Sequence, residues 1–280
     1  MRAHKIVNGT VQKNIMLVDG VYKMVIETDV CNDYVPGQFI NIYLDDKSML
    51  LPRPISICET DENGVTLVYK VVGQGTKYLT TYCETCEIKL STPLGNGFFA
   101  EGDYAGKAVA LVAGGIGIPP MLGLAKLLKK QGAKVSAFLG FQSQRFLTEE
   151  LGELCEAVHI ATDDGSFGFH GNVVDLLKGD INIIKREHNI NTVNAVEKSH
   201  ANNIYDEYFS CGPKVMLKAL SEYTTSLGKN AQVSIEERMG CGYGACVGCA
   251  CKIKEEGVVT IKAVCKHGPV FWGEDVVWDE

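Results

Sequence analysis

The stretch Cys241-Gly-Tyr-Gly-Ala-Cys246-Val-Gly-Cys249 decides how the chain is organised, together with Cys265, which follows after a short segment. Its three cysteines have the C-x4-C-x2-C spacing of plant-type [2Fe-2S] sites, in which four thiolates hold two irons. The intervening glycines suit such a loop, because it needs positive-φ positions and backbone N–H groups directed at sulfur. The spacing therefore predicts an electron-transfer site formed by Cys241, Cys246, Cys249 and Cys265.

Residues 250–264, ACKIKEEGVVTIKAV, connect this loop to Cys265. They predict a hairpin that returns Cys265 to the loop. Because side chains alternate along a strand, Cys251 would face away from Cys249, and we expect it outside the ligand set. A structural zinc site also takes four cysteines, but it usually presents two separate C-x2-C pairs. The spacing therefore favours iron–sulfur over zinc.

The composition restricts the class of protein. The 280 residues, 46% of them hydrophobic, predict an ordinary globular protein of about two domains. A net charge of -7 argues against nucleic-acid binding. No apolar run approaches the about 20 residues that span a bilayer. Eleven cysteines without a recognisable signal peptide indicate a reducing compartment, expected to be the cytoplasm, rather than a disulfide framework.

Residues 1–100 predict a small antiparallel barrel, because short β-rich runs recur between turn residues. The runs are 4–11, 22–28, 38–44, 65–72 and 87–90, with one helix expected at 75–82.

Two motifs within this region predict an anion site. Arg53-Pro54-Ile55-Ser56 opens a strand with a guanidinium and a hydroxyl, and Gly73-Gln-Gly75-Thr76 precedes the helix. A helix N-terminus behind a glycine turn binds anions, and Arg53 could pair with the same phosphate. Each motif alone is also typical of an ordinary strand start or helix cap.

Residues 101–232 predict an open α/β sheet whose ligands lie at the carboxyl ends of its strands. The apolar run 108–113 predicts a strand buried on both faces, and it enters Gly114-Gly115-Ile-Gly117 before a helix at 121–131. The position of this loop favours a pyrophosphate site at Gly114, Gly115 and Gly117. Further strands are expected at 135–141, 157–162 and 207–210, with a helix at 214–223.

Other segments of this region allow two interpretations each. Thr162-Asp163-Asp164-Gly165-Ser166 could hold a ribose or pyrophosphate through Asp164, Gly165 and Ser166, or its aspartates could be solvated turn residues. Residues 181–203, which include His188 and His200, are polar and long for a connection. They predict a surface insertion with solvated histidines. The cysteine of Cys211-Gly212-Pro213 is by itself typical of a small buried side chain.

Taken together, the barrel, Arg-Pro-Ile-Ser, Gly-Gln-Gly-Thr and Pro-Leu-Gly-Asn-Gly-Phe98 resemble the FAD domain of the ferredoxin–NADP reductase superfamily. The resemblance implies that Arg53 binds the flavin pyrophosphate and that Ser56 hydrogen-bonds near flavin N5, within a site that includes Pro54 and Ile55. Many members carry an aromatic residue where this chain has Ile55. The resemblance also implies that the strand with Val68, Tyr69 and Lys70 runs beside the flavin, and that Gly75 and Thr76 cap its phosphates. It places the turn Cys211-Gly212-Pro213 by the nicotinamide, with Cys211 as the candidate contact to the hydride-transfer site.

The order of parts, a barrel at 1–100, a nucleotide-binding unit at 101–232 and a cluster-binding unit at 233–280, most resembles the electron-transfer subunit of type B dihydroorotate dehydrogenase. The resemblance implies FAD, a [2Fe-2S] cluster and NAD, and a heterotetramer with an FMN-containing catalytic subunit. FAD would lie between the other two, since only a flavin exchanges both hydride and single electrons. The alternative function is that of a similar subunit of a ferredoxin:NADP oxidoreductase or a sulfhydrogenase. A non-enzymatic alternative is a docking protein whose C-terminal part is held together by zinc. The sequence leaves the choice between NAD and NADP open. Arg145 could bind a 2′-phosphate, whereas Asp163 and Asp164 could disfavour one.

Overall fold

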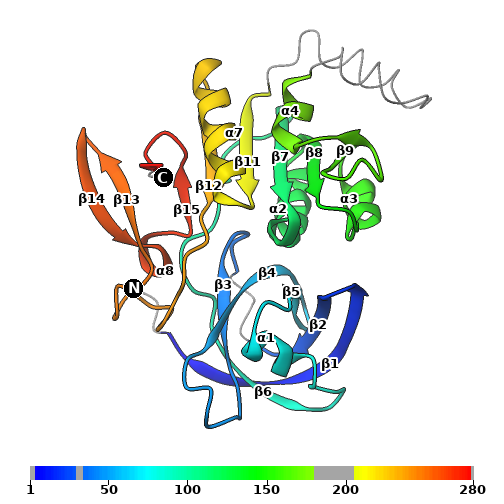
Figure 1. Ribbon diagram of the computed structural model, residues 1–280, viewed down its shortest axis with the longest axis vertical. Coiled ribbons are helices and arrows are strands. Elements are labelled where there is room, and N and C mark those ends of the chain that lie inside the picture. The colour runs from blue at the N-terminus through cyan, green and yellow to red at the C-terminus, as the bar shows by residue number, and fades with distance from the viewer. Residues whose placement is uncertain (1–3, 30–33, 180–204, 279–280) are drawn as a thin grey trace.

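The computed structural model describes residues 4–29, 34–179 and 205–278. These residues form a closed barrel, a seven-stranded sheet flanked by helices, and a two-stranded hairpin, arranged as Figure 1 shows. The predicted combination of an antiparallel barrel, an open α/β unit and a small C-terminal unit is confirmed. The expected insertion at 181–203, with His188 and His200, lies outside the described residues. In the described ranges no helix is long and apolar enough to cross a membrane.

The barrel closes in the strand order β1-β2-β5-β4-β3-β6. Every neighbouring pair is antiparallel, and closure leaves no exposed sheet edge. Its strands are β1 (Ile6–Val18), β2 (Val21–Glu27), β3 (Phe39–Tyr43), β4 (Arg53–Asp61), β5 (Gly64–Lys70) and β6 (Glu87–Ser91). The first predicted strand is therefore too short, because β1 continues past Val11 to pair with β2 after pairing with β6.

The helix of the barrel, α1 (Gln74–Leu79), is shorter than predicted. After Leu79 the backbone N–H groups of Thr80, Thr81 and Tyr82 donate to carbonyls three residues back. The hydroxyls of Thr80 and Thr81 donate to the carbonyl oxygens of Lys77 and Tyr78. These local side-chain bonds replace the α-helical pattern and end the helix.

The large sheet has the strand order β10-β9-β8-β7-β11-β12-β15. All its neighbours are parallel except β12 and β15. Its strands are β7 (Ala108–Gly114), β8 (Lys134–Phe141), β9 (Ala157–Thr162), β10 (Phe169–His170), β11 (Glu207–Cys211), β12 (Ala231–Ser234) and β15 (Val270–Trp272). Its helices are η1 (Gly115–Gly117), α2 (Pro119–Lys130), α3 (Thr148–Leu154), α4 (Val173–Lys178) and α7 (Lys214–Ser226).

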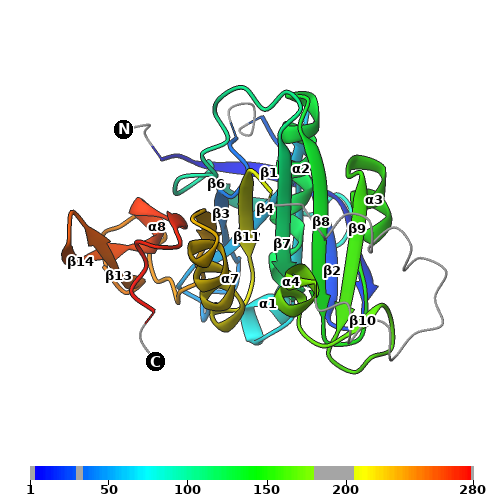
Figure 2. The ribbon, with the colours of Figure 1, turned by 90° about the horizontal axis from the view of Figure 1, so that it is seen from above.

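Helices cover both faces of this sheet (Figure 2). Leu111 and Ala113 of β7 pack in one cluster with α2 and α3, and Ala110 and Val112 pack in another with α4 and α7. This two-sided burial explains the continuous apolar run at 108–113.

The barrel lies against the sheet through α2. Gly123 of α2 approaches β4 so closely that an added Cβ would stand 2.8 Å from the carbonyl oxygen of Cys58. Val21, Cys58 and Val68 of the barrel belong to the same apolar cluster as α2. This contact places the carboxyl ends of the parallel strands of the large sheet beside β4 and β5 of the barrel.

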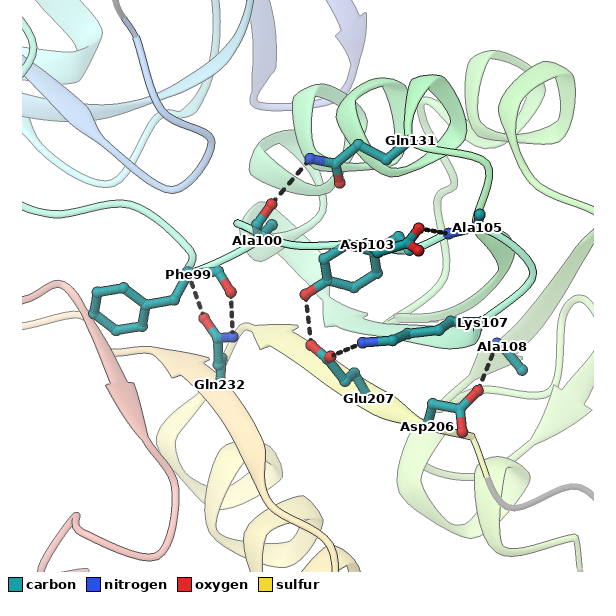
Figure 3. A network of polar contacts seen from close by, with 11 residues as sticks. Phe99, Ala100, Asp103, Ala105, Lys107, Ala108, Gln131, Asp206, Glu207 and Gln232 are labelled. Carbon is teal, nitrogen blue, oxygen red and sulfur yellow. Dashed lines mark hydrogen bonds and ion pairs between the residues drawn. The ribbon is translucent and has the colours of Figure 1, made fainter.

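Polar contacts hold the connection between barrel and sheet (Figure 3). The amide of Gln232 accepts from the backbone N–H of Phe99 at 2.7 Å and donates to its carbonyl oxygen at 3.0 Å. The hydroxyl of Tyr104 donates to Glu207 at 2.6 Å, and Lys107 pairs with the same carboxylate at 3.2 Å. The connection is thereby fixed to β11 and β12.

The C-terminal part leaves the sheet after β12 and returns to it. It forms the loop with Cys241, the predicted hairpin of β13 (Ala250–Glu255) and β14 (Val258–Ala263), and α8 (Val264–His267). β15 then pairs antiparallel with β12 at the sheet edge. A three-residue strand is too short to show alternation in a sequence, so the pattern at 233–280 did not reveal that this unit shares the sheet.

Candidate flavin, nucleotide and iron–sulfur sites

A cavity of about 340 Å³ lies between the barrel, the sheet and the segment after β12. The predicted flavin residues meet there on β4, β5 and α1. Those lining it are Arg53, Pro54, Ile55, Ser56, Val68, Tyr69, Lys70 and Thr76. Residues more than ten positions apart therefore share one wall, as the motifs imply.

Arg53 and Gly75 are in direct contact beside this cavity. A Cβ added at Gly75 would stand 1.7 Å from Nε of Arg53, so only glycine admits the guanidinium at this place. Nη1 of Arg53 donates to the carbonyl oxygen of Leu51, which holds the side chain in place. A fixed cation beside the first turn of α1 suits a diphosphate.

The hydroxyl of Thr76 already serves the helix. It accepts from the backbone N–H groups of Val72 at 2.9 Å and Gly73 at 3.2 Å. A phosphate at this position would therefore meet the backbone of Gly75 and Thr76 rather than the threonine side chain.

The segment after β12 supplies a wall of the cavity that the motifs did not reveal. After Ser234, the last residue of β12, this segment lines the cavity with Ile235, Glu236, Glu237 and Met239 and continues to Cys241. Phe39, Ile116 and Pro269 complete the lining. The rule that ligands lie at the carboxyl ends of parallel strands would have found Glu236, two residues after β12.

A second cavity, of about 550 Å³, lies at the carboxyl ends of β7, β8 and β11. Gly114, Gly115, Gly117, Gly212 and Pro213 line it, so the two predicted glycine turns meet. This cavity shares Lys70, Ile116 and Glu236 with the flavin cavity. The two cavities therefore adjoin, and burial raises the pKa of Glu236 at the place where they join.

The turn at 162–166 contributes differently from the prediction. Asp163 lines the second cavity, whereas Ser166 lines a shallow neighbouring site with Arg145. Asp164 accepts from the backbone N–H of Ser166 at 2.9 Å, and hydrogen bonds from this serine lower the pKa of Asp164. Asp164 and Gly165 line neither site, so the turn interpretation describes Asp164 better.

Cys211 is 2% exposed and lines neither cavity. Burial, and then the nearby Glu236, raise the pKa of its thiol to about 12. The backbone of Cys211 lies directly behind the nucleotide loop, since a Cβ at Gly117 would stand 2.3 Å from its carbonyl oxygen. The structure thus gives Cys211 a packing contact with the loop and places it behind the residues that line the two cavities.

The four cysteines of the predicted metal site come together on the loop and α8. The backbone N–H of Cys246 donates to Sγ of Cys241 at 3.4 Å, and the backbone N–H of Cys265 donates to Sγ of Cys249 at 3.4 Å. The backbone N–H of Gly244 donates to Sγ of Cys265 at 3.1 Å, and that of Ala245 to Sγ of Cys241 at 3.3 Å. Gly242 and Gly244 have φ of 79° and 89°, as the loop prediction requires.

The chemistry of these cysteines suits a [2Fe-2S] cluster, in which four protein thiolates hold two irons. Burial raises the pKa of Cys241, but backbone N–H groups donating to its sulfur outweigh this and lower the pKa to about 6. The donor set therefore fits the cluster.

Cys251 lies apart from this set. It packs with the apolar cluster around β15 and α7, and burial raises the pKa of its thiol to about 11.

Comparison with known proteins agrees with this geometry. Residues 236–277 match the family model described as the iron–sulfur cluster binding domain of dihydroorotate dehydrogenase B. The dihydroorotate dehydrogenase B (NAD(+)) electron transfer subunit of Fusobacterium nucleatum subsp. nucleatum is 38% identical over 278 residues, covering 97% of this chain and 98% of that protein. The protein of the same name from Clostridium perfringens is 37% identical, covering 96% of each chain.

Solved structures share the fold. A structure of the NADH-dependent reduced ferredoxin-NADP oxidoreductase is 27% identical with a TM-score of 0.77, over 96% of this chain and 90% of that chain. A ferredoxin NADP+ reductase from Neisseria gonorrhoeae with bound FAD and NADP has a TM-score of 0.62 at 16% identity, over 80% of this chain and 92% of that chain. The curated relatives are 37% to 38% identical to this chain over nearly its full length, and this similarity shows the family. The chain belongs to the family of dihydroorotate dehydrogenase B electron transfer subunits.

Proposed function

We propose that this chain passes electrons between a [2Fe-2S] cluster, FAD and NAD, on behalf of a separate FMN-containing subunit that oxidises dihydroorotate. One observation carries the proposal: the flavin cavity touches all three parts of the chain. Ser56 comes from the barrel, Ile116 from the nucleotide loop, and Met239 from the segment that enters the cysteine loop. When bound, nicotinamide exchanges only hydride, the cluster only single electrons, and the flavin both, so the central cavity is the one for FAD.

In this proposal Arg53 and the backbone at Gly75 and Thr76 bind the flavin pyrophosphate. Ser56 would face the flavin ring, and the cavity wall beside it is formed by Pro54, Ile55, Val68, Tyr69 and Lys70. Nicotinamide and flavin would meet at the wall that the two cavities share, formed by Lys70, Ile116 and Glu236.

The nucleotide would lie on the glycine turns of the second cavity. The cavity residues that would contact it are Gly114, Gly115, Gly117, Gly212 and Pro213. The turn with Asp164, Gly165 and Ser166 adjoins this cavity through Asp163, and Cys211 lies behind the loop. The curated relatives are NAD(+) enzymes, which supports NAD as the acceptor.

Cys241, Cys246, Cys249 and Cys265 would hold the cluster, with Cys246 exposed at the surface. Around it lies a groove lined by Leu50, Leu51 and Tyr243, whose exposed fractions are 87%, 59% and 50%. An exposed apolar surface beside a redox centre suits the docking of a protein partner. We place the catalytic subunit here, in a heterotetramer, and the assembly in the cytoplasm, where the free thiols remain reduced.

The alternative function, as a ferredoxin:NADP oxidoreductase or sulfhydrogenase subunit, has less support. The solved oxidoreductase is 27% identical, whereas the curated dihydroorotate dehydrogenase relatives reach 38% over nearly the same length.

Co-purification tests the function. The native complex should contain FAD, FMN, iron and sulfide, and should reduce NAD with dihydroorotate. An isolated chain that is colourless and contains zinc but no iron would contradict the proposal. A coloured complex that reduces NAD with a donor other than dihydroorotate would support the alternative.

A further inference from the structure

One strand of the barrel connects the flavin cavity to the cysteine loop. Phe39, at the start of β3, lines the cavity and pairs with Ser56 across the β3–β4 ladder. Two residues along, Nδ2 of Asn41 donates to the carbonyl oxygen of Cys241 at 2.9 Å. Residues at positions i and i+2 lie on one face of a strand, roughly 6 to 7 Å apart.

The two faces of β3 have different neighbours. Ile40 and Ile42 point into the core of the barrel. Phe39 points the other way and belongs to the apolar cluster that contains Cys249 and Cys265. The outward face of β3 therefore borders both the cavity and the candidate ligands.

An asparagine side chain is energetically unfavourable at position 41. It is 0% exposed within an otherwise apolar strand, and its Oδ1 has no hydrogen-bond partner within the described part of the chain. An unpaired buried polar atom destabilises the folded state, so barrel packing alone does not explain an amide here.

The cysteine loop is shaped to receive this amide. A Cβ at Gly242 would stand 2.4 Å from Nδ2 and 2.6 Å from Oδ1 of Asn41, and Gly242 has a φ of 79°. The loop thus rests directly on the side chain, and the hydrogen bond that it accepts from Asn41 is to the backbone of a candidate ligand.

We propose that Asn41 is the positioning residue that fixes the cluster loop, through Cys241, to the strand that borders the flavin cavity. The inference rests on the proposed function and deepens it: β3 sets the relative placement of the two redox sites.

The test compares Asn41→Leu, which keeps the approximate shape and removes the hydrogen bond, with Ser91→Ala. Ser91 is the matched control, because its Oγ accepts from the backbone N–H of Asn41 at 2.9 Å and is not bonded to the loop. The full chain, loaded with FAD and iron, is mixed rapidly with NADH. Flavin reduction is followed by absorbance, and cluster reduction by its paramagnetic resonance spectrum in frozen samples.

We expect flavin reduction at the parent rate in both variants. Cluster reduction should slow about 10- to 100-fold in Asn41→Leu, as is typical for the loss of an outer ligand partner, with a changed resonance spectrum. Ser91→Ala should match the parent. A fully loaded Asn41→Leu with the parent rate and spectrum overturns the inference and leaves the proposed function intact. A parent chain that binds no iron contradicts the proposed function instead.

Asn41→Asp provides a second variant if the leucine chain does not fold. A carboxylate has a similar shape but accepts hydrogen bonds and does not donate them. Cluster reduction should therefore slow in Asn41→Asp as in Asn41→Leu. A fully loaded Asn41→Asp with the parent rate and spectrum overturns the inference.

Discussion

The guanidinium of Arg53 lies on the Cα of Gly75, where an added Cβ would stand 1.7 Å from Nε. β4 and α1 meet at this contact, which sets a positive charge beside backbone N–H groups that lack intrahelical partners. The fit of a flavin pyrophosphate depends on both residues at once, since one supplies the charge and the other the space.

Arg53→Ala is expected to weaken FAD binding by about 1.5 to 3 kcal/mol, the usual contribution of a charge-assisted hydrogen bond. The fold should remain, because the guanidinium lies at the rim of a closed barrel. Flavin retention during dialysis measures the loss. Arg53→Lys, which keeps the charge without the planar fork, should retain an intermediate amount. Equal retention in all three proteins would show that Arg53 does not contact the flavin.

Serine at Cys241, Cys246, Cys249 or Cys265 should remove the cluster. Each thiolate would supply one of the four protein ligands of the two irons, so the loss of any one leaves the set incomplete. Cys251→Ser is the control and should retain iron and sulfide. Loss of iron in Cys251→Ser together with retention in Cys265→Ser would reverse the assignment.

Gly117→Ala should disturb the nucleotide loop, because its Cβ would stand 2.3 Å from the carbonyl oxygen of Cys211. We expect a loss of about 1 to 3 kcal/mol in unfolding free energy and weaker NADH binding. Gly152→Ala in α3 is the matched control, since nothing lies within 4 Å of its added Cβ. It should stabilise the protein by roughly 0.5 to 1 kcal/mol. Denaturant unfolding measures the change in stability, and titration with NADH measures the change in affinity. Equal effects of the two substitutions would contradict the packing argument.

Glu236 should make stability depend on pH. Burial raises its pKa in the folded protein, so the folded state holds this proton more tightly than the unfolded chain. The contribution to stability is therefore full at or below the ordinary carboxyl pKa and falls as pH rises through the raised value. Glu236→Gln should raise the thermal midpoint more at about pH 8 than at about pH 5. Glu150→Gln, at an exposed position of α3, should change the midpoint equally at both. A pH-independent effect of Glu236→Gln would exclude this linkage.

The isolated chain should oxidise NADH with an artificial acceptor and show no activity toward dihydroorotate. Cys246→Ala should keep flavin reduction by NADH, because that step involves the two adjoining cavities and not the loop. Reconstituted with the catalytic subunit, the same variant should lose dihydroorotate-driven NAD reduction. If it supports that reaction at the parent rate, the cluster is not on the electron path.

Much of the site was accessible from local sequence. The C-x4-C-x2-C spacing, the glycine turns and Arg-Pro-Ile-Ser are short motifs whose members lie near each other because the chain joins them. The pattern of β-rich runs also predicts the barrel, although β1 runs from Ile6 to Val18 and not from 4 to 11. Strand ends depend on partners elsewhere in the chain, and β1 has one at each end.

The sequence by itself determined the three parts, their order and the cysteines available to a cluster, since hydrophobic period and residue spacing are properties of contiguous segments. Only the tertiary structure decided that β15 completes the sheet of the second part, that Glu236 lies between the two cavities, and that Asn41 reaches Cys241. Asn41 and Cys241 are 200 residues apart in the sequence, and a local sequence pattern cannot predict a contact over that separation. Such contacts follow from how the barrel and sheet pack, where burial of one surface against another brings distant side chains within a few ångströms.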